Sequence, residues 1–384
     1  MDFALTLDQE RFQAAARTFA GRHLAPHYLR RDREDAMDRE MVREMGRLGL
    51  IAPVLPEEMG GLGLEALTMG LLVEEIARGD FNVGYVQMLA ALCGQILHRH
   101  ATPALAAEWG QRLCAGEALM ALALTEPQTG SDAAHIQLRA RAAGDHYVLN
   151  GEKTSISFAH QAEAAIVFAR TGAEADGAHG VSAFLVPMEL PGIHRTRFED
   201  VGSHTVGRGS IFFEDAKVPA EMRLGDEGRG FTQVMQGFEF SRALIGLQCL
   251  GAAAASLEET WRYVAERKAF GSPVVRFQGV SGPLAEAETQ LEALRLLCYR
   301  TLWLKDQGEP HTAQAAMCKW WGPKTAFDVI HSCLLMHGHG GYGSETPHQQ
   351  RLRDVMGLEI GDGTAQIMKL IIARERVGRV AVPY

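Results

Sequence analysis

The spacing of apolar residues along the chain changes twice. In residues 1–118, apolar side chains recur every three or four positions, which is the period of a helix with one buried face. The clearest segments are Leu7–Phe19, Met41–Leu50 and Leu67–Ala77. These residues are therefore predicted to form an all-helical N-terminal domain.

Between residues 119 and 222 the spacing shortens towards two, the period of a half-buried strand. Strands are predicted at Leu122–Leu124, Tyr147–Leu149, Ala164–Arg170, Val181–Val186 and Ser210–Phe213. Asn150-Gly151 follows the second strand, and this dipeptide favours the positive φ angles of a two-residue hairpin turn. The pattern predicts a middle β-domain with a hairpin at this point.

From residue 223 to residue 384 the helical spacing returns in long segments rich in Ala and Leu. These segments are Phe231–Phe270, Leu284–Asp306, Thr312–His337 and Ala365–Val377. Their lengths suit a helical bundle. Helices, then strands, then helices indicate an α+β chain of three layers, and they exclude the strand–helix alternation of a dinucleotide-binding sheet.

The uncharged stretch Phe81–Leu97 is 17 residues long and is interrupted by polar side chains. A membrane span needs about 20 apolar residues, so we expect a buried helix instead. Met1–Glu10 lacks the basic start and apolar run of a signal peptide. We therefore expect a cytoplasmic protein that does not bind a membrane.

Composition narrows the classes of function. Of 384 residues, 47% are hydrophobic and 22% are charged, which is typical of a globular protein. The 47 acidic residues outnumber the 38 basic ones and give a formal net charge of −9. A nucleic-acid-binding protein needs a clustered positive surface, so this balance argues against one.

Neither the cysteines nor the histidines indicate a metal site. None of the six cysteines is separated from another by the two or three residues of a zinc or redox motif. We expect buried thiols in a reducing compartment. His337 with His339, and His98 with His100, lack a carboxylate or cysteine to complete a ligand set, and surface or capping roles suit them better.

The segment Gly338–Gly343 reads GHGGYG and matches the glycine spacing of a dinucleotide-binding loop. That loop must follow a strand, whereas Phe327–Met336 is predicted to be helical, so we reject this function. Two alternatives stay open: a flexible helix C-cap, or a place where backbone approaches a ligand without interference from Cβ.

Three further segments could hold polar ligand groups. Thr125–Asp132 ends a strand with hydroxyls and glycine, which suits a ligand cradle or a plain turn. Arg267–Gly271 places a cation beside Phe270, which suits a phosphate with a flat ring or a solvated helix end. Gly361-Asp362-Gly363 precedes a helix, where the carboxylate could lean into a cleft or cap the helix.

Taken together and in this order, the segments resemble the acyl-CoA dehydrogenase family over essentially the whole chain. The matching segments are LALTEPQTGSD (122–132), NGEKTSIS (150–157), RKAFGSPVVRFQ (267–278), GHGGYG (338–343) and RLRDVMGLEIGDGTAQI (351–367). The resemblance implies an N-terminal helical domain, a middle β-barrel-like domain and a C-terminal four-helix bundle. It also implies FAD as cofactor, an acyl-CoA substrate, electron-transferring flavoprotein as acceptor, and a homotetramer (dimer of dimers) in which a neighbouring subunit completes each FAD site.

The resemblance assigns roles residue by residue. The catalytic base that removes the Cα proton falls on Asp362, whose backbone N–H would hold the thioester oxygen together with a ribityl hydroxyl of FAD. The expected FAD contacts are Leu124, Thr125, Ser131, Ser157, Arg267, Phe270, Gln278, His337, Gly341, Thr364 and Gln366. The expected acyl-CoA contacts are Ser131, Glu239, Arg242 and Gly363. Among the FAD contacts, residues 267, 270, 278, 337 and 341 are expected to act across a subunit interface.

This chain departs from the family pattern at three positions. It has Asp362 where the family usually has Glu, Ser155 where an aromatic residue is usual, and His337 where Gln is frequent. Some relatives carry the base at a position that is Ser241 here, and serine cannot serve as that base. A shorter base and a wider space beside the flavin favour a bulky acyl group.

Together with KTSIS and EIGDGTAQI, these departures resemble the cyclohexane-1-carbonyl-CoA dehydrogenase branch. The predicted reaction converts cyclohexane-1-carbonyl-CoA to cyclohex-1-ene-1-carbonyl-CoA. A short branched-chain acyl-CoA substrate, and a flavin monooxygenase on the same fold, are the alternatives.

Overall fold

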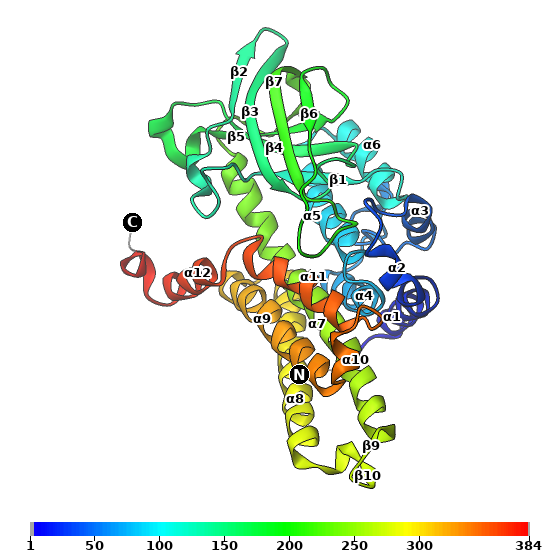
Figure 1. The fold of residues 1–384 in the computed structure, drawn as a ribbon. Helices are drawn as coiled ribbons and strands as arrows, with labels where there is room; N and C mark the ends of the chain where they lie inside the picture. The colour runs from blue at the N-terminus through cyan, green and yellow to red at the C-terminus, as the bar shows by residue number, and fades with distance from the viewer. Residues whose placement is uncertain (1–3, 383–384) are drawn as a thin grey trace.

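The computed structural model describes residues 4–382, and its three layers follow one another along the chain (Figure 1). In this view the strands gather at the top, the first helices lie to the right, and the long C-terminal helices extend downwards. The order of helices, strands and helices confirms the predicted α+β class. Residues 1–3, part of the segment that bears on a signal peptide, lie outside the described range.

The N-terminal layer consists of helices and short helical turns. Its helices are α1 (Leu7–Phe19), α2 (Tyr28–Arg31), α3 (Arg39–Arg47), α4 (Ala66–Gly79), α5 (Gly84–His100) and α6 (Pro103–Cys114). Three of them, α1, α3 and α4, match the segments predicted from helical spacing. The uncharged stretch forms most of α5, which is buried along nearly its whole length, so it is a core helix as predicted.

The middle layer is an eight-stranded mixed sheet. Its strands are β1 (Met120–Ala123), β2 (Arg139–Ala143), β3 (His146–Ile156), β4 (Ala164–Arg170), β5 (Val181–Pro187), β6 (Ile193–Arg195), β7 (Gly209–Pro219) and β8 (Arg223–Leu224). The order is β6-β7-β3-β2-β4-β5-β8, and β1 runs parallel to β4. Every residue of β4 is buried, so the core of this layer surrounds that strand.

The predicted hairpin at Asn150-Gly151 is wrong. Both residues lie inside β3, where the pairing with β7 shifts its register. The side chain of Asn150 makes two 2.9 Å hydrogen bonds with Asp215 of β7, whose φ is 51°, and Gly151 has φ 136°. A β-bulge therefore satisfies the positive-φ preference here. The tight turn between β2 and β3 falls instead at Gly144, where φ is 71°.

The C-terminal layer is a bundle of long helices. It contains α7 (Gly230–Glu266), α8 (Gln278–Asp306), α9 (Thr312–Met336), α10 (His339–Tyr342), α11 (His348–Ile360) and α12 (Ala365–Val377). The four predicted helices correspond to α7, α8, α9 and α12, whereas the spacing did not predict α11. Helix α7 ends earlier than predicted, because the chain becomes extended at Arg267 and forms a small hairpin of β9 (Lys268–Ala269) and β10 (Ser272–Pro273).

Helix α7 runs through the middle of the bundle. Among residues 4–382 it is the one helix that is long and apolar enough to cross a membrane, but its most apolar stretch is entirely buried inside the protein. Gly246 of α7 faces Gly322 of α9, where an added Cβ would lie 2.8 Å from the Gly246 Cα. The two helices therefore pack backbone to backbone. Arg242 and Lys319 lie one turn before these glycines, each on its own helix.

Candidate active site

A cavity of about 630 Å³ opens where the three layers meet. Its walls come from α5, the end of β1, the loop of residues 200–206, the first half of α7, and the link between α11 and α12. Ligand sites in proteins have volumes of roughly 300–1,000 Å³, so this cavity is large enough for one. A second cavity of about 360 Å³ is lined by none of the predicted site residues.

The fold brings many of the predicted site residues to the large cavity. The predicted residues that line it are Leu124, Thr125, Ser131, Ser157, Arg242, Asp362, Gly363 and Thr364. They come from the middle layer and from two distant parts of the C-terminal layer, and Ser155 lines the cavity beside them. Their roles towards FAD and acyl-CoA stay predictions, but their convergence on one cavity is a structural fact.

Other predicted contacts lie outside the cavity of their own chain. Arg267, Phe270 and Gln278 are exposed around the β9–β10 hairpin, at the far end of the bundle from the sheet (Figure 1). Phe270 is 96% exposed and has φ 51°. Gln366 is exposed on α12, and Glu239 accepts a 2.5 Å hydrogen bond from Thr312.

The GHGGYG segment follows helix α9, which agrees with the rejection of a dinucleotide-binding loop. Gly338 has φ 59° and ends α9, and a Cβ on Gly341 would lie 2.0 Å from the Leu334 carbonyl oxygen. These glycines therefore serve the helix end. The His337 ring stacks on Tyr263 at 4.2 Å and its Nε2 lies 3.2 Å from the Thr260 hydroxyl, so it packs within its own chain.

Asp362 projects from a short link between two helices. It has φ 55°, an uncommon conformation for a residue with a side chain, and Gly363 beside it has φ 100°. The N-cap of α12 is Thr364, whose hydroxyl accepts a 3.4 Å hydrogen bond from the Ile367 N–H. The alternative that Asp362 caps this helix is therefore wrong, and its carboxylate is left for the cavity.

Within the described part of the chain, three carboxylates line the cavity, and one of them has no partner. Asp200 accepts two hydrogen bonds from Arg208, and Asp354 accepts from Tyr28, Asn82 and the Ser203 N–H. Asp362 has no hydrogen-bond or ion-pair partner within residues 4–382. The hydroxyl of Ser241, at the alternative base position, is buried and donates to the Phe238 carbonyl. Asp362 is thus the carboxylate best placed to accept a proton in the cavity.

Two buried cations face Asp362. Loss of water around Asp362 raises the pKa of this carboxyl, while the charges of Lys319 and Arg242 act in the opposite direction. Arg242 is 5% exposed, and its guanidinium has no hydrogen-bond partner among the described residues. Burial also lowers the pKa of Arg242 below its usual range. An unpaired buried cation in a cavity wall suits a polar or anionic ligand atom.

A buried ion pair shapes the strand-to-loop corner that carries Thr125. Lys153 donates 2.8 Å hydrogen bonds to the Leu124 carbonyl and to the Glu126 carboxylate. Glu126 also accepts from the N–H groups of Gln137 and Leu138. Burial lowers the pKa of Lys153 to about 8. The sequence motifs contain both charged residues, but their pairing becomes visible only in the folded chain.

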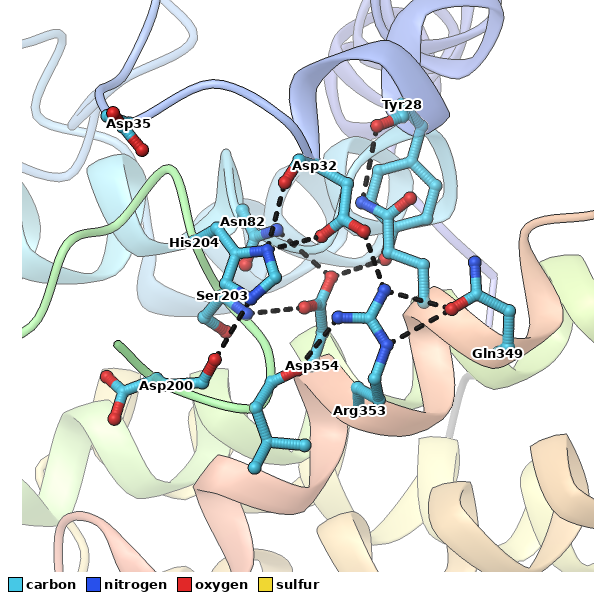
Figure 2. Close-up of polar contacts among 12 residues, drawn as sticks. Tyr28, Asp32, Asp35, Asn82, Asp200, Ser203, His204, Gln349, Arg353 and Asp354 are labelled. Atoms are coloured by element: carbon cyan, nitrogen blue, oxygen red, sulfur yellow. Dashed lines mark hydrogen bonds and ion pairs between the residues drawn. The ribbon is translucent and has the colours of Figure 1, made fainter. Parts of the chain in front are cut away.

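Figure 2 shows a polar cluster that joins residues of all three layers. Asp200, Ser203 and Asp354 of this cluster also line the cavity. His204 contacts Asp32, and Arg353 donates to Asp32 and to the Val201 carbonyl. Asp354 accepts at 2.6 Å from the Ser203 N–H. These contacts hold the loop of residues 200–206, which forms one wall of the cavity.

The cavity residues fit a flavin. The hydroxyls of Thr125, Ser131 and Ser157 line the cavity and make no hydrogen bond to another residue in the range 4–382. Hydroxyls both donate and accept, which matches the mixture of N–H, ring nitrogen and carbonyl groups on an isoalloxazine ring. Ser155, exposed onto the cavity, leaves additional space on this wall.

Some residues of the site are absent from the sequence prediction. Two of them, Tyr85 and Asp354, line the cavity. The third is Lys319, which donates a hydrogen bond to the carbonyl of Gly363, next to Asp362. Lys319 had one visible signal: it is a single charge in the otherwise uncharged helical segment 312–323. No spacing rule links it to Asp362.

No group of three His, Cys, Asp or Glu side chains is placed to hold a metal ion within the part of the chain that the structure describes. All six cysteines are free and buried, in agreement with the expectation of buried thiols.

Comparison with known proteins gives matches over nearly the whole chain. Residues 6–117, 121–216 and 228–376 match the models of the N-terminal, middle and C-terminal domains of acyl-CoA dehydrogenase. The mitochondrial short-chain specific acyl-CoA dehydrogenase of Rattus norvegicus is 36% identical over 360 residues, covering 93% of this chain and 87% of that protein.

Solved structures agree with this match. Butyryl-CoA dehydrogenase from Megasphaera elsdenii has a TM-score of 0.94 and 33% identity, covering 98% of this chain and 100% of that chain. Glutaryl-CoA dehydrogenase from Mycobacterium smegmatis, in complex with FADH2, has a TM-score of 0.92 and 25% identity, covering 97% of this chain and 95% of that chain. With its fold, its free carboxylate and its hydroxyl-lined cavity, the chain belongs to the acyl-CoA dehydrogenase family, whose members are FAD-dependent oxidoreductases that act on CH–CH bonds of acyl-CoA thioesters.

Proposed function

We propose that this acyl-CoA dehydrogenase oxidises cyclohexane-1-carbonyl-CoA to cyclohex-1-ene-1-carbonyl-CoA, with Asp362 as the base that removes the Cα proton. The main support for this role of Asp362 is that its carboxylate is free of partners. Of the carboxylates on the cavity wall, it is the one without a hydrogen-bond or ion-pair partner in residues 4–382. A carboxylate without a partner keeps its lone pairs available for a proton.

The chain's own groups account for proton removal and charge stabilisation. Asp362 accepts the Cα proton, and negative charge then develops on the thioester oxygen. The backbone N–H of Asp362 has no acceptor within residues 4–382 and is available to this oxygen. One oriented donor of this kind contributes roughly 3–4 kcal/mol to the transition state. When bound, FAD supplies the acceptor for the hydride that leaves Cβ.

The pKa of the base supports this role. An unperturbed aspartate has a pKa near 3.9 and is a weak base at neutral pH. Removal of water already raises the pKa of Asp362, and an acyl group in the cavity would exclude more water. Lys319 and Arg242 oppose this rise, because their positive charges favour the ionised form of the carboxylate.

The alicyclic substrate is supported by three features of the cavity. Asp362 is one methylene shorter than the usual Glu, so the Cα of the substrate must lie closer to the backbone. Ser155 replaces a large ring and leaves space beside the flavin. Apolar side chains such as Met88, Leu92 and Phe238 line the cavity from α5 and α7 and suit a saturated ring.

The remaining partners are proposed from family membership. We expect electron-transferring flavoprotein to reoxidise the flavin, and a homotetramer arranged as a dimer of dimers. The exposure of Phe270 and Tyr342, at 96% and 88%, supports burial of these rings by a second copy. The six free thiols support a reducing location such as the cytoplasm.

The test is anaerobic mixing of purified yellow protein with cyclohexane-1-carbonyl-CoA, isobutyryl-CoA and butyryl-CoA, one at a time. Loss of the visible flavin absorbance reports oxidation of the thioester. We expect the alicyclic thioester to give the fastest bleaching, and Asp362→Ala to abolish nearly all of it. Unchanged bleaching by Asp362→Ala would contradict the assignment of the base.

A short acyl chain is the second candidate. The rat relative named above is a short-chain specific enzyme, and the Megasphaera neighbour is a butyryl-CoA dehydrogenase. Faster bleaching by isobutyryl-CoA or butyryl-CoA than by the alicyclic thioester would favour this candidate. A flavin monooxygenase would not need the acid at residue 362, so its activity would survive Asp362→Ala.

A further inference from the structure

Lys319 is a buried cation that makes a single hydrogen bond among the described residues. It lies on α9, is 1% exposed, and its ammonium donates a hydrogen bond to the carbonyl oxygen of Gly363. No other hydrogen-bond partner of this ammonium occurs in residues 4–382, although the group carries three N–H donors. Burying an ammonium with so few partners is unfavourable, and burial lowers the pKa of Lys319 to about 8.

The contact fixes the segment that carries the proposed base. Glycines on both sides leave Asp362 with a flexible backbone. On one side, the Gly361 N–H donates to the Gly357 carbonyl at 3.0 Å and ties the link to α11. On the other side, Lys319 holds the Gly363 carbonyl, and Thr364 caps α12. The link is therefore anchored to α9 as well as to its own two helices.

The charge of Lys319 also acts on the carboxylate itself. Its ammonium and the Arg242 guanidinium are the two cations that face Asp362, and Lys319 has the larger effect on this pKa. Tyr85 of α5 also faces Asp362. Around Lys319 the other ionisable groups are Cys249 of α7, Arg242 and Glu359 of α11. No hydrogen-bond partner of the Asp362 carboxylate occurs in residues 4–382, so the charges of Lys319 and Arg242 are what lowers its pKa against the effect of burial.

We propose that Lys319 is a positioning residue for Asp362: it anchors the glycine-flanked link through the Gly363 carbonyl and keeps the carboxylate ionised inside a cavity from which substrate expels water. The proposal rests on the proposed function, because it concerns the base of that reaction. It makes Lys319 part of the active site without any contact between Lys319 and the substrate.

Two substitutions separate the two effects. Lys319→Gln keeps an N–H donor for the Gly363 carbonyl and removes the charge, whereas Lys319→Met removes both. Lys324→Met is the matched control, because Lys324 lies on the same helix, is exposed, and pairs only with Asp328 at 2.7 Å within the described residues. All variants are compared as the purified FAD-loaded protein, with flavin content measured first.

The kinetic measurement is the pH dependence of anaerobic flavin bleaching by the best thioester of the panel. Removal of the charge should move the acid limb of the profile upwards by about one pH unit, which corresponds to about tenfold slower bleaching below the limb. Lys319→Gln should recover most of its rate at high pH, while Lys319→Met should stay slower. A lower rate at every pH with an unmoved limb would overturn the proposal, because that result indicates a structural role alone.

A second measurement does not depend on turnover. The apparent melting temperature is determined for wild type, Lys319→Met, Asp362→Asn and the double variant, which form a double-mutant cycle. If Lys319 and Asp362 interact, Lys319→Met should change the melting temperature less in the Asp362→Asn background than in the wild type. Additive changes would overturn the proposal. If no thioester bleaches the wild type, the proposed function fails, and the cycle still decides whether Lys319 and Asp362 interact.

Discussion

The hydroxyl of Tyr28 donates a 2.6 Å hydrogen bond to Asp354, across a sequence separation of 326 residues. Both residues are buried, and Asp354 also accepts from Asn82 and from the Ser203 N–H (Figure 2). One carboxylate thus joins the N-terminal helices, the loop of residues 200–206 and helix α11. Because that loop lines the cavity, the contact fixes the site as well as the fold.

Tyr28→Phe removes one donor from this buried carboxylate. We expect a loss of about 1–3 kcal/mol of stability, since an incompletely satisfied buried charge is unfavourable. Thermal unfolding of the holoprotein measures the change. Thr18→Val is the control, because the Thr18 hydroxyl is exposed on α1 and its removal should leave the melting temperature nearly unchanged. Equal effects of the two variants would contradict the role of the Tyr28 hydroxyl.

Asp354 should give stability a specific pH dependence. Burial, with the charges of Asp32 and Asp80 nearby, raises the pKa of Asp354 to about 6, above the ordinary 3.8. A carboxyl with a raised pKa binds its proton more tightly in the folded state, so it stabilises the fold at low pH. This contribution should be lost as the pH rises from about 4 through 6.

The measurement compares the melting temperatures of wild type and Asp354→Asn between pH 4 and pH 8. Relative to the variant, wild type should lose stability up to about pH 6 and then stay level. A difference that is constant over this range, or that grows in the opposite direction, would show that Asp354 is ionised throughout.

The ion pair of Lys153 and Glu126 should be essential for cofactor retention. Both side chains are almost fully buried, and breaking such a pair by removing one partner costs about 3–5 kcal/mol. Lys153→Met should therefore lower the melting temperature and the FAD content, because Lys153 also holds the Leu124 carbonyl at the cavity wall. The double variant Lys153→Met/Glu126→Gln should keep a higher melting temperature and a higher FAD content than Lys153→Met alone. A lower melting temperature or a lower FAD content in the double variant would contradict this prediction.

Ser155→Trp tests the space beside the flavin. The larger ring should fill the cavity wall and lower kcat/KM for the alicyclic thioester by tenfold or more relative to butyryl-CoA, a ratio of about 1.4 kcal/mol. Ser155→Ala is the control and should leave the ratio near that of wild type. Ser155 has φ 59°, so any strain of the backbone should affect both thioesters alike. An unchanged ratio in Ser155→Trp would remove the support that this position gives to a ring substrate.

Asp362→Glu tests the length of the base. The longer side chain should raise the rate with butyryl-CoA and lower it with cyclohexane-1-carbonyl-CoA, because a displacement of about 1 Å at the reacting atoms can change a rate around 100-fold. Stopped-flow bleaching with each thioester gives the two rates. A parallel change in both rates would show that the position of the base does not discriminate between these substrates.

The sequence by itself determined the order of the layers. Apolar side chains at helical spacing form one face that a helix can bury, so segments such as Leu7–Phe19 and Ala365–Val377 form the predicted helices. The motifs of the sequence also contain Thr125, Asp362 and Thr364, which line the cavity, and their resemblance to the acyl-CoA dehydrogenase family is what marked these residues as candidates for the site.

Tertiary structure decided what depends on distant partners. Asn150-Gly151 has the local preference of a hairpin, yet its pairing with Asp215 makes it a bulge. Asp362 has the local preference of a helix cap, yet Thr364 takes that role and leaves the carboxylate free. Lys319 carries no local signal towards residue 363, since their contact exists only because α9 packs against α11 and α12. The spacing of residues along a chain predicts local geometry. The packing of remote segments decides which hydrogen-bond partners, how much water and which charges surround a side chain.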